Sequence, residues 1–170
     1  MERRQFIENA ALFGVGLAAT AMHSQTAKAG EVAKEPTKAS PLLLQAPDVV
    51  KTLPQFAEMA SMCAGKGDLC VEHCEEQLAK GATEFASCSV ASRQMLVLCG
   101  TVAKLASMKS VRLSETLDAC SAACKACKEA CEEHKPHWKH GMHIECKNCF
   151  EHCEKMLTEV SKLKNLLAKS

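Results

Sequence analysis

The chain has 170 residues, enough for one domain with its own core. Its 21 Lys and Arg residues nearly balance 20 Asp and Glu residues, so nothing in the charge indicates a nucleic-acid partner or an anionic membrane surface. Aromatic residues make up only 4% of the chain, whereas cysteine occurs 12 times. Thiols pack like small hydrophobes and must therefore supply much of the core.

The first 29 residues are typical of an export signal. A basic start contains Arg3 and Arg4, an apolar run covers residues 10–21, and a small-residue cleavage site ends at Ala29. The paired arginines resemble a twin-arginine signal, with an ordinary secretory signal as the alternative. Removal of this segment leaves 18 basic and 18 acidic residues. We expect the mature protein in the periplasm or in the lumen of associated internal membranes.

Residues 30–47 hold three prolines and little periodicity, which predicts a flexible leader. The rest of the chain, residues 48–170, predicts a helical metal-storage domain. Its helices are expected over about 53–80, 83–108, 114–134 and 142–168. Short loops favour antiparallel neighbours, so the expected fold is all-α, an antiparallel up-down-up-down four-helix bundle. No segment after the signal is predicted to span a membrane.

Local signals refine the predicted helix boundaries. Gly65 and Gly67 predict a break in the first helix, with Asp68 capping its second half. Ser114 is the predicted N-cap of the third helix, and Pro136 limits that helix at its other end.

The cysteines lie at helical spacing. Steps of three, four, seven and eleven residues return to nearly one face of an α-helix at about 100° per residue. All twelve thiols can therefore point one way from their helices, which predicts a cysteine-lined bundle core. The candidate metal ligands are Cys63, Cys70, Cys74, Cys88, Cys99, Cys120, Cys124, Cys127, Cys131, Cys146, Cys149 and Cys153.

Disulfides are one use that these thiols could have, because the expected compartment is oxidising and the number is even. The Cβ atoms of residues four apart on a helix lie about 5–6 Å apart, however, and a disulfide needs about 3.8 Å. A disulfide-stabilised exported protein, bridged between helices, remains an alternative, as does a zinc-binding one. The spacing matches neither an iron–sulfur motif nor a covalent haem motif.

Monovalent copper fits the spacing best. Two thiolates on opposite sides of one metal ion lie about 4.5 Å apart, which cysteines four residues apart reach by rotating χ1. Soft thiolate ligands select Cu(I), and one Cu(I) per thiolate neutralises charges that are prohibitive to bury alone. We therefore predict storage of multiple Cu(I) ions, about one per cysteine. No nucleophile–base–acid arrangement indicates an enzyme.

Methionine and histidine extend the candidate ligand set. Met59 and Met62, at the start of the first helix, are soft ligands suited to an entrance, with core filling as the alternative. His134 and His143 each lie three residues from a cysteine and are candidate ligands that cap the cysteine column, with a solvated loop as the alternative. His73 lies about 100° off the cysteine stripe and is expected to be exposed or at an interface.

Taken together, these residues resemble the cysteine-rich four-helix-bundle copper storage proteins, in particular exported, twin-arginine members described from methane-oxidising bacteria. The resemblance covers about residues 59–153 and rests on Met59-x2-Met62-Cys63-x6-Cys70-x2-His73-Cys74, on Cys88 and Cys99, and on the two cysteine-dense helices. It implies a homotetramer that holds Cu(I) chiefly in two-cysteine sites. A copper donor and a recipient copper enzyme are then the expected partners. The exported pattern also has one more core cysteine than this chain.

Overall fold

The computed structural model describes residues 42–170, so the predicted signal and most of the predicted leader lie outside the described residues. The described residues form four long helices, with a 3-10 turn η1 and a one-turn helix α4 in two of the connections. The elements are α1 (Pro47–Ala79), η1 (Thr83–Phe85), α2 (Ala86–Ser107), α3 (Leu113–Glu132), α4 (Lys135–Trp138) and α5 (Ile144–Leu167).

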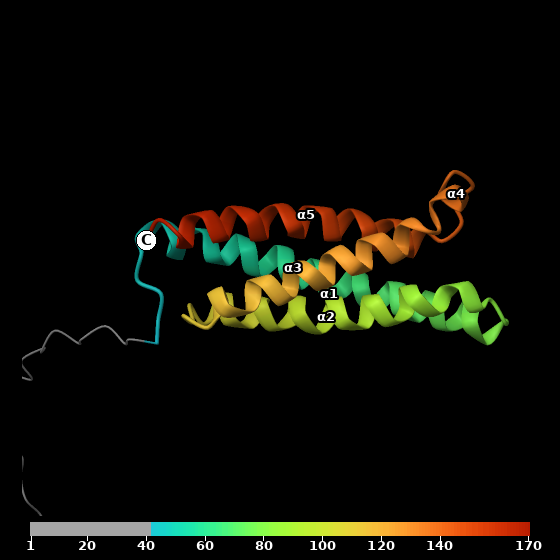
Figure 1. Cartoon of the computed structure of the whole chain (residues 1–170), viewed down its shortest axis with the longest axis horizontal. Helices are drawn as coiled ribbons and strands as arrows, with labels where there is room; N and C mark the ends of the chain where they lie inside the picture. Colours follow the sequence, from blue (N-terminus) through green and yellow to red (C-terminus); the bar gives the residue numbers. More distant parts are fainter. Residues whose placement is uncertain (1–41) are drawn as a thin grey trace, which may run out of the picture. The chain divides into compact units, whose positions relative to one another are not determined.

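The four long helices run up and down in turn, and the start of α1 lies near the end of α5 (Figure 1). α2 packs between α1 and α3, and α5 closes the ring by packing on α3 and α1. Each link between them is short, which places consecutive helices side by side in opposite directions. The predicted all-α four-helix bundle is confirmed.

The core has two parts along the bundle axis. At the end where α1 begins and α5 finishes, aliphatic side chains with at most 2% exposure fill the interior. We call this the apolar end; its residues are Leu53, Leu113, Leu117, Val160 and Leu163. From the middle of the bundle to the other end, cysteines fill the interior. Burying each aliphatic side chain contributes about 1.5–3 kcal/mol, so the apolar end anchors the fold without any metal.

The first helix begins earlier than the sequence predicted. α1 starts at Pro47, whose fixed φ and missing N–H suit the first turn of a helix. The residues just before it are also bonded to the bundle, although the prediction placed them in the leader. The Leu44 N–H donates to the Lys109 carbonyl at 2.7 Å, and the Val111 N–H donates to the Leu42 carbonyl at 3.1 Å.

The predicted break within the first helix is wrong, because α1 continues through both glycines. Gly67 is buried, and a Cβ there would lie 2.7 Å from the Met95 Cε and 3.0 Å from the Leu96 Cβ of α2. This glycine therefore permits close approach of two helices rather than a turn. A Cβ at Gly65, in contrast, would have nothing within 4 Å, so no neighbouring helix requires a glycine at that position.

The predicted N-cap of the third helix is also wrong. α3 begins at Leu113, and the Ser114 hydroxyl donates to the Val111 carbonyl at 2.9 Å instead of accepting a bond from the first turn. A serine hydroxyl near a helix start can accept a hydrogen bond from the first turn or donate one to a preceding carbonyl. The preference of serine for N-cap positions does not distinguish these two cases.

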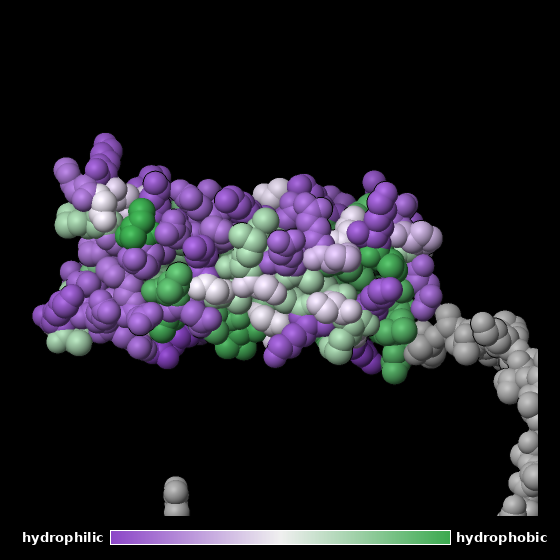
Figure 2. Space-filling model, turned by 180° about the vertical axis from the view of Figure 1, so that it is seen from behind, coloured by the Kyte–Doolittle hydropathy of each residue, from purple (hydrophilic) through white to green (hydrophobic). Residues whose placement is uncertain are grey.

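One described segment, Thr83–Ser107, has the length and composition of a membrane span, although no span was predicted there. The core helix of a water-exposed bundle passes the same test, and α2 holds Cys88 and Cys99 inside this bundle. On the face seen in Figure 2, hydrophilic side chains cover most of one end, and hydrophobic ones gather toward the middle and the end where the described chain starts. Leu69, Val90 and Val97 are among the exposed aliphatic residues of α1 and α2.

Candidate metal centre

The twelve cysteines form one column inside the bundle. Every one of them is a free thiol with 0% exposure. They come from all four long helices, so the predicted one-sided stripe faces the interior on each of them. We call this set of side chains the thiol column.

A shared register on neighbouring helices builds the column. Positions separated by four, three and four residues face inward on α1, α2 and α3, because those steps stay on one helix face. All four such positions are cysteine on α3: Cys120, Cys124, Cys127 and Cys131. On α2 they are Cys88, Ser92, Met95 and Cys99, and on α1 they are Cys63, Gly67, Cys70 and Cys74. α5 contributes Cys146, Cys149 and Cys153.

The shortest sulfur–sulfur contacts join different helices. The Cys127 and Cys149 Sγ atoms lie 3.4 Å apart, and the Sγ atoms of Cys99 and Cys124 lie 3.5 Å apart. The Cys70 Sγ lies 3.8 Å from that of Cys131. These separations exceed a disulfide bond of about 2.05 Å but fall below the roughly 4.5 Å between two thiolates on one two-coordinate metal ion. Small side-chain rotations therefore suffice to admit metal ions between helices.

Five sets of cysteines have sulfur atoms that all lie within 4.8 Å of one another, and together they include all twelve. Three of them contain a pair four residues apart on one helix, as expected for Cu(I) sites on a single helix, together with thiols from other helices. The sets are Cys70, Cys74, Cys88 and Cys146; Cys63, Cys124 and Cys153; Cys70, Cys131 and Cys149; Cys99, Cys120 and Cys124; and Cys127, Cys149 and Cys153. A ligand set of two or three sulfurs is thus available along the whole column.

Two residues of α2 join the column although neither was predicted as a ligand. The Met95 Sδ lies 3.5 Å from the Cys63 Sγ, and Met95 is fully buried. The Ser92 hydroxyl lies 3.4 Å from the sulfurs of both Cys70 and Cys127. The sequence does indicate that both face the column, because the spacing of Cys88, Ser92, Met95 and Cys99 repeats the spacing of the four cysteines of α3.

The histidines gather at the end of the column opposite the apolar end. His134 and His143 lie three residues, or about one helical turn, beyond Cys131 and Cys146. His134 is 5% exposed, so it is not part of a solvated loop. His73, which was expected to be exposed or at an interface, instead has its Nε2 3.0 Å from the Nδ1 of His143. We call this the histidine end.

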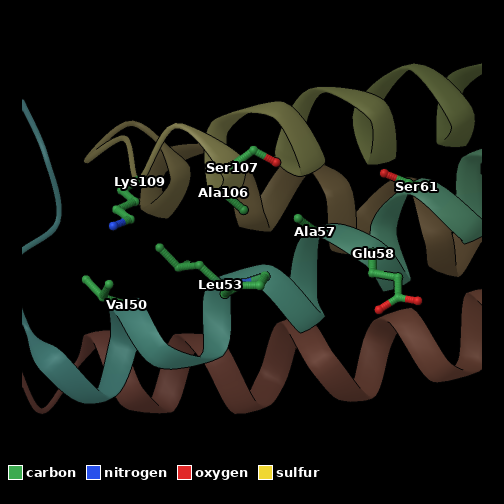
Figure 3. A pocket seen from close by; sticks show the side chains of 9 residues that line it. Val50, Leu53, Ala57, Glu58, Ser61, Ala106, Ser107 and Lys109 are labelled. Carbon is green, nitrogen blue, oxygen red and sulfur yellow. The ribbon is translucent and has the colours of Figure 1, made fainter.

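The methionines predicted as an entrance lie toward the other half of the bundle. Met62 is 46% exposed, and Met59 is half-buried against the core. A cavity of about 450 Å³ lies in this region between α1 and the end of α2 (Figure 3). Leu53, Ala57, Ala106 and Lys109 are among its lining residues, and no cysteine, methionine or histidine lines it. This cavity therefore offers no soft ligand for copper.

Residues 49–158 match the family of Csp copper storage proteins. The chain belongs to this family. The match spans all twelve cysteines and the histidine end. No curated protein matches the chain.

The thiols of this copper storage family member share protons between helices. Hydrogen bonds from Cys124, then Cys153, lower the pKa of Cys63, and one from Cys131 lowers the pKa of Cys70. The bond with Cys124 raises the pKa of Cys120 to about 12, and burial acts in the same direction. A thiolate in the column is thus stabilised by neighbouring S–H donors, which themselves stay protonated. Empty, most of the column is neutral.

Proposed function

We propose that the thiol column stores multiple Cu(I) ions as thiolate complexes, for later supply to copper enzymes, and that the chain has no catalytic turnover. The observation that carries this proposal is that all twelve cysteines are free, buried and within 4.8 Å of at least two other thiols. Membership of the copper storage family supports the same metal.

Coordination number favours Cu(I) over zinc. Structural zinc sites take four ligands in a tetrahedron, and only one of the five sets contains four thiols, namely Cys70, Cys74, Cys88 and Cys146. Twelve thiols that each bind a single ion would satisfy three zinc ions. Cu(I) is held by two or three soft ligands, and shared sulfurs allow close to one ion per thiol.

Charge balance makes the filled column stable. Each Cu(I) that enters displaces one thiol proton and leaves one thiolate, so the interior stays neutral at every stage of loading. A buried thiolate without a cation is far less stable than a neutral thiol, even where neighbouring S–H donors surround it. Met95 adds an uncharged thioether beside Cys63, and we propose that it serves as a further Cu(I) ligand.

Anaerobic titration of the reduced protein with Cu(I), against a competing chelator, tests the proposal. We expect a capacity approaching twelve ions per chain. Cys124→Ser should lower the capacity more than Cys120→Ser, because Cys124 belongs to two thiol sets and Cys120, one turn away on α3, to one. Saturation at one or two Cu(I) ions, or at about three zinc ions in preference to copper, would contradict storage of Cu(I).

The assembly and location of the protein are further proposals. We propose a homotetramer, which the exposed aliphatic residues Leu69, Val90 and Val97 on α1 and α2 support. We also propose export by a twin-arginine signal, supported by the sequence of residues 1–29 alone. Light scattering measures the first, and retention of an Arg3→Lys, Arg4→Lys double variant in the cytoplasm tests the second.

A further inference from the structure

The histidine end contains a cluster of imidazoles that the thiol column does not need. His143 lies at its centre, with ring centroids 5.2 Å from His73, 5.6 Å from His137 and 5.8 Å from His134. The rings pack around Phe85, which stacks on His134 with centroids 4.1 Å apart. The cluster thus combines residues of α1 with residues of the segment between α3 and α5.

Two imidazoles of this cluster, those of His73 and His143, are spaced as two ligands of one metal ion. A tetrahedral zinc with bonds of about 2.0–2.1 Å holds its nitrogen ligands about 3.3 Å apart and their ring centroids roughly 5 Å apart. The His73 Nε2 and the His143 Nδ1 are 3.0 Å apart. The three-residue sets within 4.8 Å among the described residues include no histidine, so a third imidazole must turn toward the ion.

His134 offers a buried ring nitrogen that could bind a ligand. It is 95% buried, and its Nε2 has no hydrogen-bond partner among the described residues. A buried polar nitrogen without a partner destabilises the fold, and a bound metal ion would offset that cost. A cavity of about 140 Å³ lies beside it and is lined also by His137 and His143.

The second ring nitrogen of His73 is oriented as in a metal site. Its Nδ1 lies 3.5 Å from the Glu145 Oε2, while its Nε2 faces His143. A carboxylate on one nitrogen fixes the tautomer and leaves the other nitrogen free to bind metal, which is a common outer shell around metal-bound histidine. Glu145 also adds the negative charge that favours a divalent ion.

His143 adopts a backbone conformation that a bonded ion would help to maintain. Its φ is 52° and its ψ is 40°, in the left-handed region that non-glycine residues seldom adopt. This conformation places the residue directly before α5, and its ring at the centre of the cluster. Backbone strain of this kind is found where a ligand clamp needs a particular side-chain position.

We propose that His73, His134 and His143 form a second metal site, separate from the thiol column. The site binds one divalent first-row ion such as Zn²⁺ or Co²⁺. His137 is its fourth ligand, and the Glu145 carboxylate holds His73 in position. Neutral imidazole prefers such borderline ions, whereas the thiols prefer Cu(I). The site is independent of whether the column stores copper.

Co²⁺ added anaerobically to protein whose Cu(I) content has already been measured tests this site. We expect one Co²⁺ per chain, with visible ligand-field bands and without a sulfur-to-cobalt charge-transfer band. His143→Asn, which tolerates the left-handed backbone, and His134→Gln should each weaken Co²⁺ binding at least about 100-fold, and Glu145→Gln about 10-fold. The prior count of Cu(I) reports separately on copper storage.

Two histidines outside the cluster provide matched controls. His152 bonds the Asn148 carbonyl on α5, and His140 is exposed, so His152→Asn and His140→Asn should leave Co²⁺ binding unchanged. Shifts of the imidazole nitrogens of the unmutated protein on adding Zn²⁺, observed by NMR, keep the test valid if a variant fails to fold. Three outcomes would overturn the proposal. The first is the absence of both these shifts and bound Co²⁺, and the second is an equal loss of Co²⁺ binding in the control variants. The third is that His134→Gln and His143→Asn lower the Cu(I) count and have no other effect.

Discussion

Single residues of α2 determine where the thiol column departs from a continuous run of sulfur. Ser92 occupies the register position of a cysteine and contacts the sulfurs of Cys70 and Cys127 at 3.4 Å. Its hydroxyl is a hard, neutral oxygen and a poor ligand for Cu(I). The column therefore holds a soft-ligand gap at this level, bordered on α2 by the thioether of Met95.

Ser92→Cys should close this gap. A thiol there lies within reach of two existing sulfurs, so we expect the Cu(I) capacity to rise by about one ion per chain, measured by chelator competition. Ser89→Cys is the matched control, because Ser89 is buried on the same helix but lies outside the inward-facing register of α2. An equal rise in both variants would show that capacity follows the number of thiols rather than their place in the column.

The inward-facing positions of the cysteines were predictable from the sequence, whereas the positions of the other candidate residues were less so. Cysteines that recur at helical spacing on four helices indicate an inward-facing ligand set, and all twelve lie in the column. The prediction for His73 differs from the structure because its angle on α1 lies off the cysteine stripe, whereas its contact with His143 depends on how the segment before α5 folds back. Met95 carries no signal of a ligand in the sequence, because a buried methionine is ordinary core material.

At the scale of helices, α1 and α2 pack closely because a glycine faces a methionine. Gly67 occupies a column position on α1, and the Met95 side chain of α2 extends into the space that a larger residue there would fill. A glycine within a helix reads in the sequence as a weak point or a break. Its role in α1 follows from the neighbouring helix, which sequence periodicity does not locate, so the helices were predictable but this junction was not.

Gly67→Ala should destabilise the bundle. The new Cβ would meet the Met95 Cε at 2.7 Å and the Leu96 Cβ at 3.0 Å, and overpacking of a core costs about 1–3 kcal/mol. Gly65→Ala, two residues away in open space, should instead stabilise the helix by about 0.5–1 kcal/mol. Urea unfolding of both metal-free variants measures the difference, and equal effects would contradict the close packing of α1 on α2.

For the whole molecule, the core has two parts with different roles: the apolar end stabilises the fold, and the thiol column provides the candidate metal ligands. The aliphatic residues of the apolar end are buried whether or not copper is present, and protonated thiols pack as small hydrophobes. The bundle topology was predictable because four amphipathic segments with short links have few other arrangements. The division of the core into two parts was not predicted. The sequence feature that indicates it is the absence of cysteines before Cys63 and after Cys153.

Metal removal should therefore leave the fold intact but less stable. We expect the metal-free protein to keep the helical content of the loaded protein, measured by far-ultraviolet circular dichroism. Each Cu(I) that binds only the folded state adds about 2.7 kcal/mol when free Cu(I) is about 100 times its Kd, so loading should raise Tm by at least about 10 °C. Loss of helix on chelation would show that copper, rather than the apolar end, holds the bundle together.

The buried aliphatic side chains at the apolar end also determine the order in which metal ions would enter and leave the thiol column. With Leu53, Leu113, Leu117 and Leu163 blocking one exit, ions that reach the level of Cys120 must pass every shallower position on the way in and again on the way out. If the column stores Cu(I) as we propose, it would work as a last-in, first-out stack. The copper delivered most recently would then be the first to be handed on, and the deepest ions would form a reserve that is drawn only when the rest is gone.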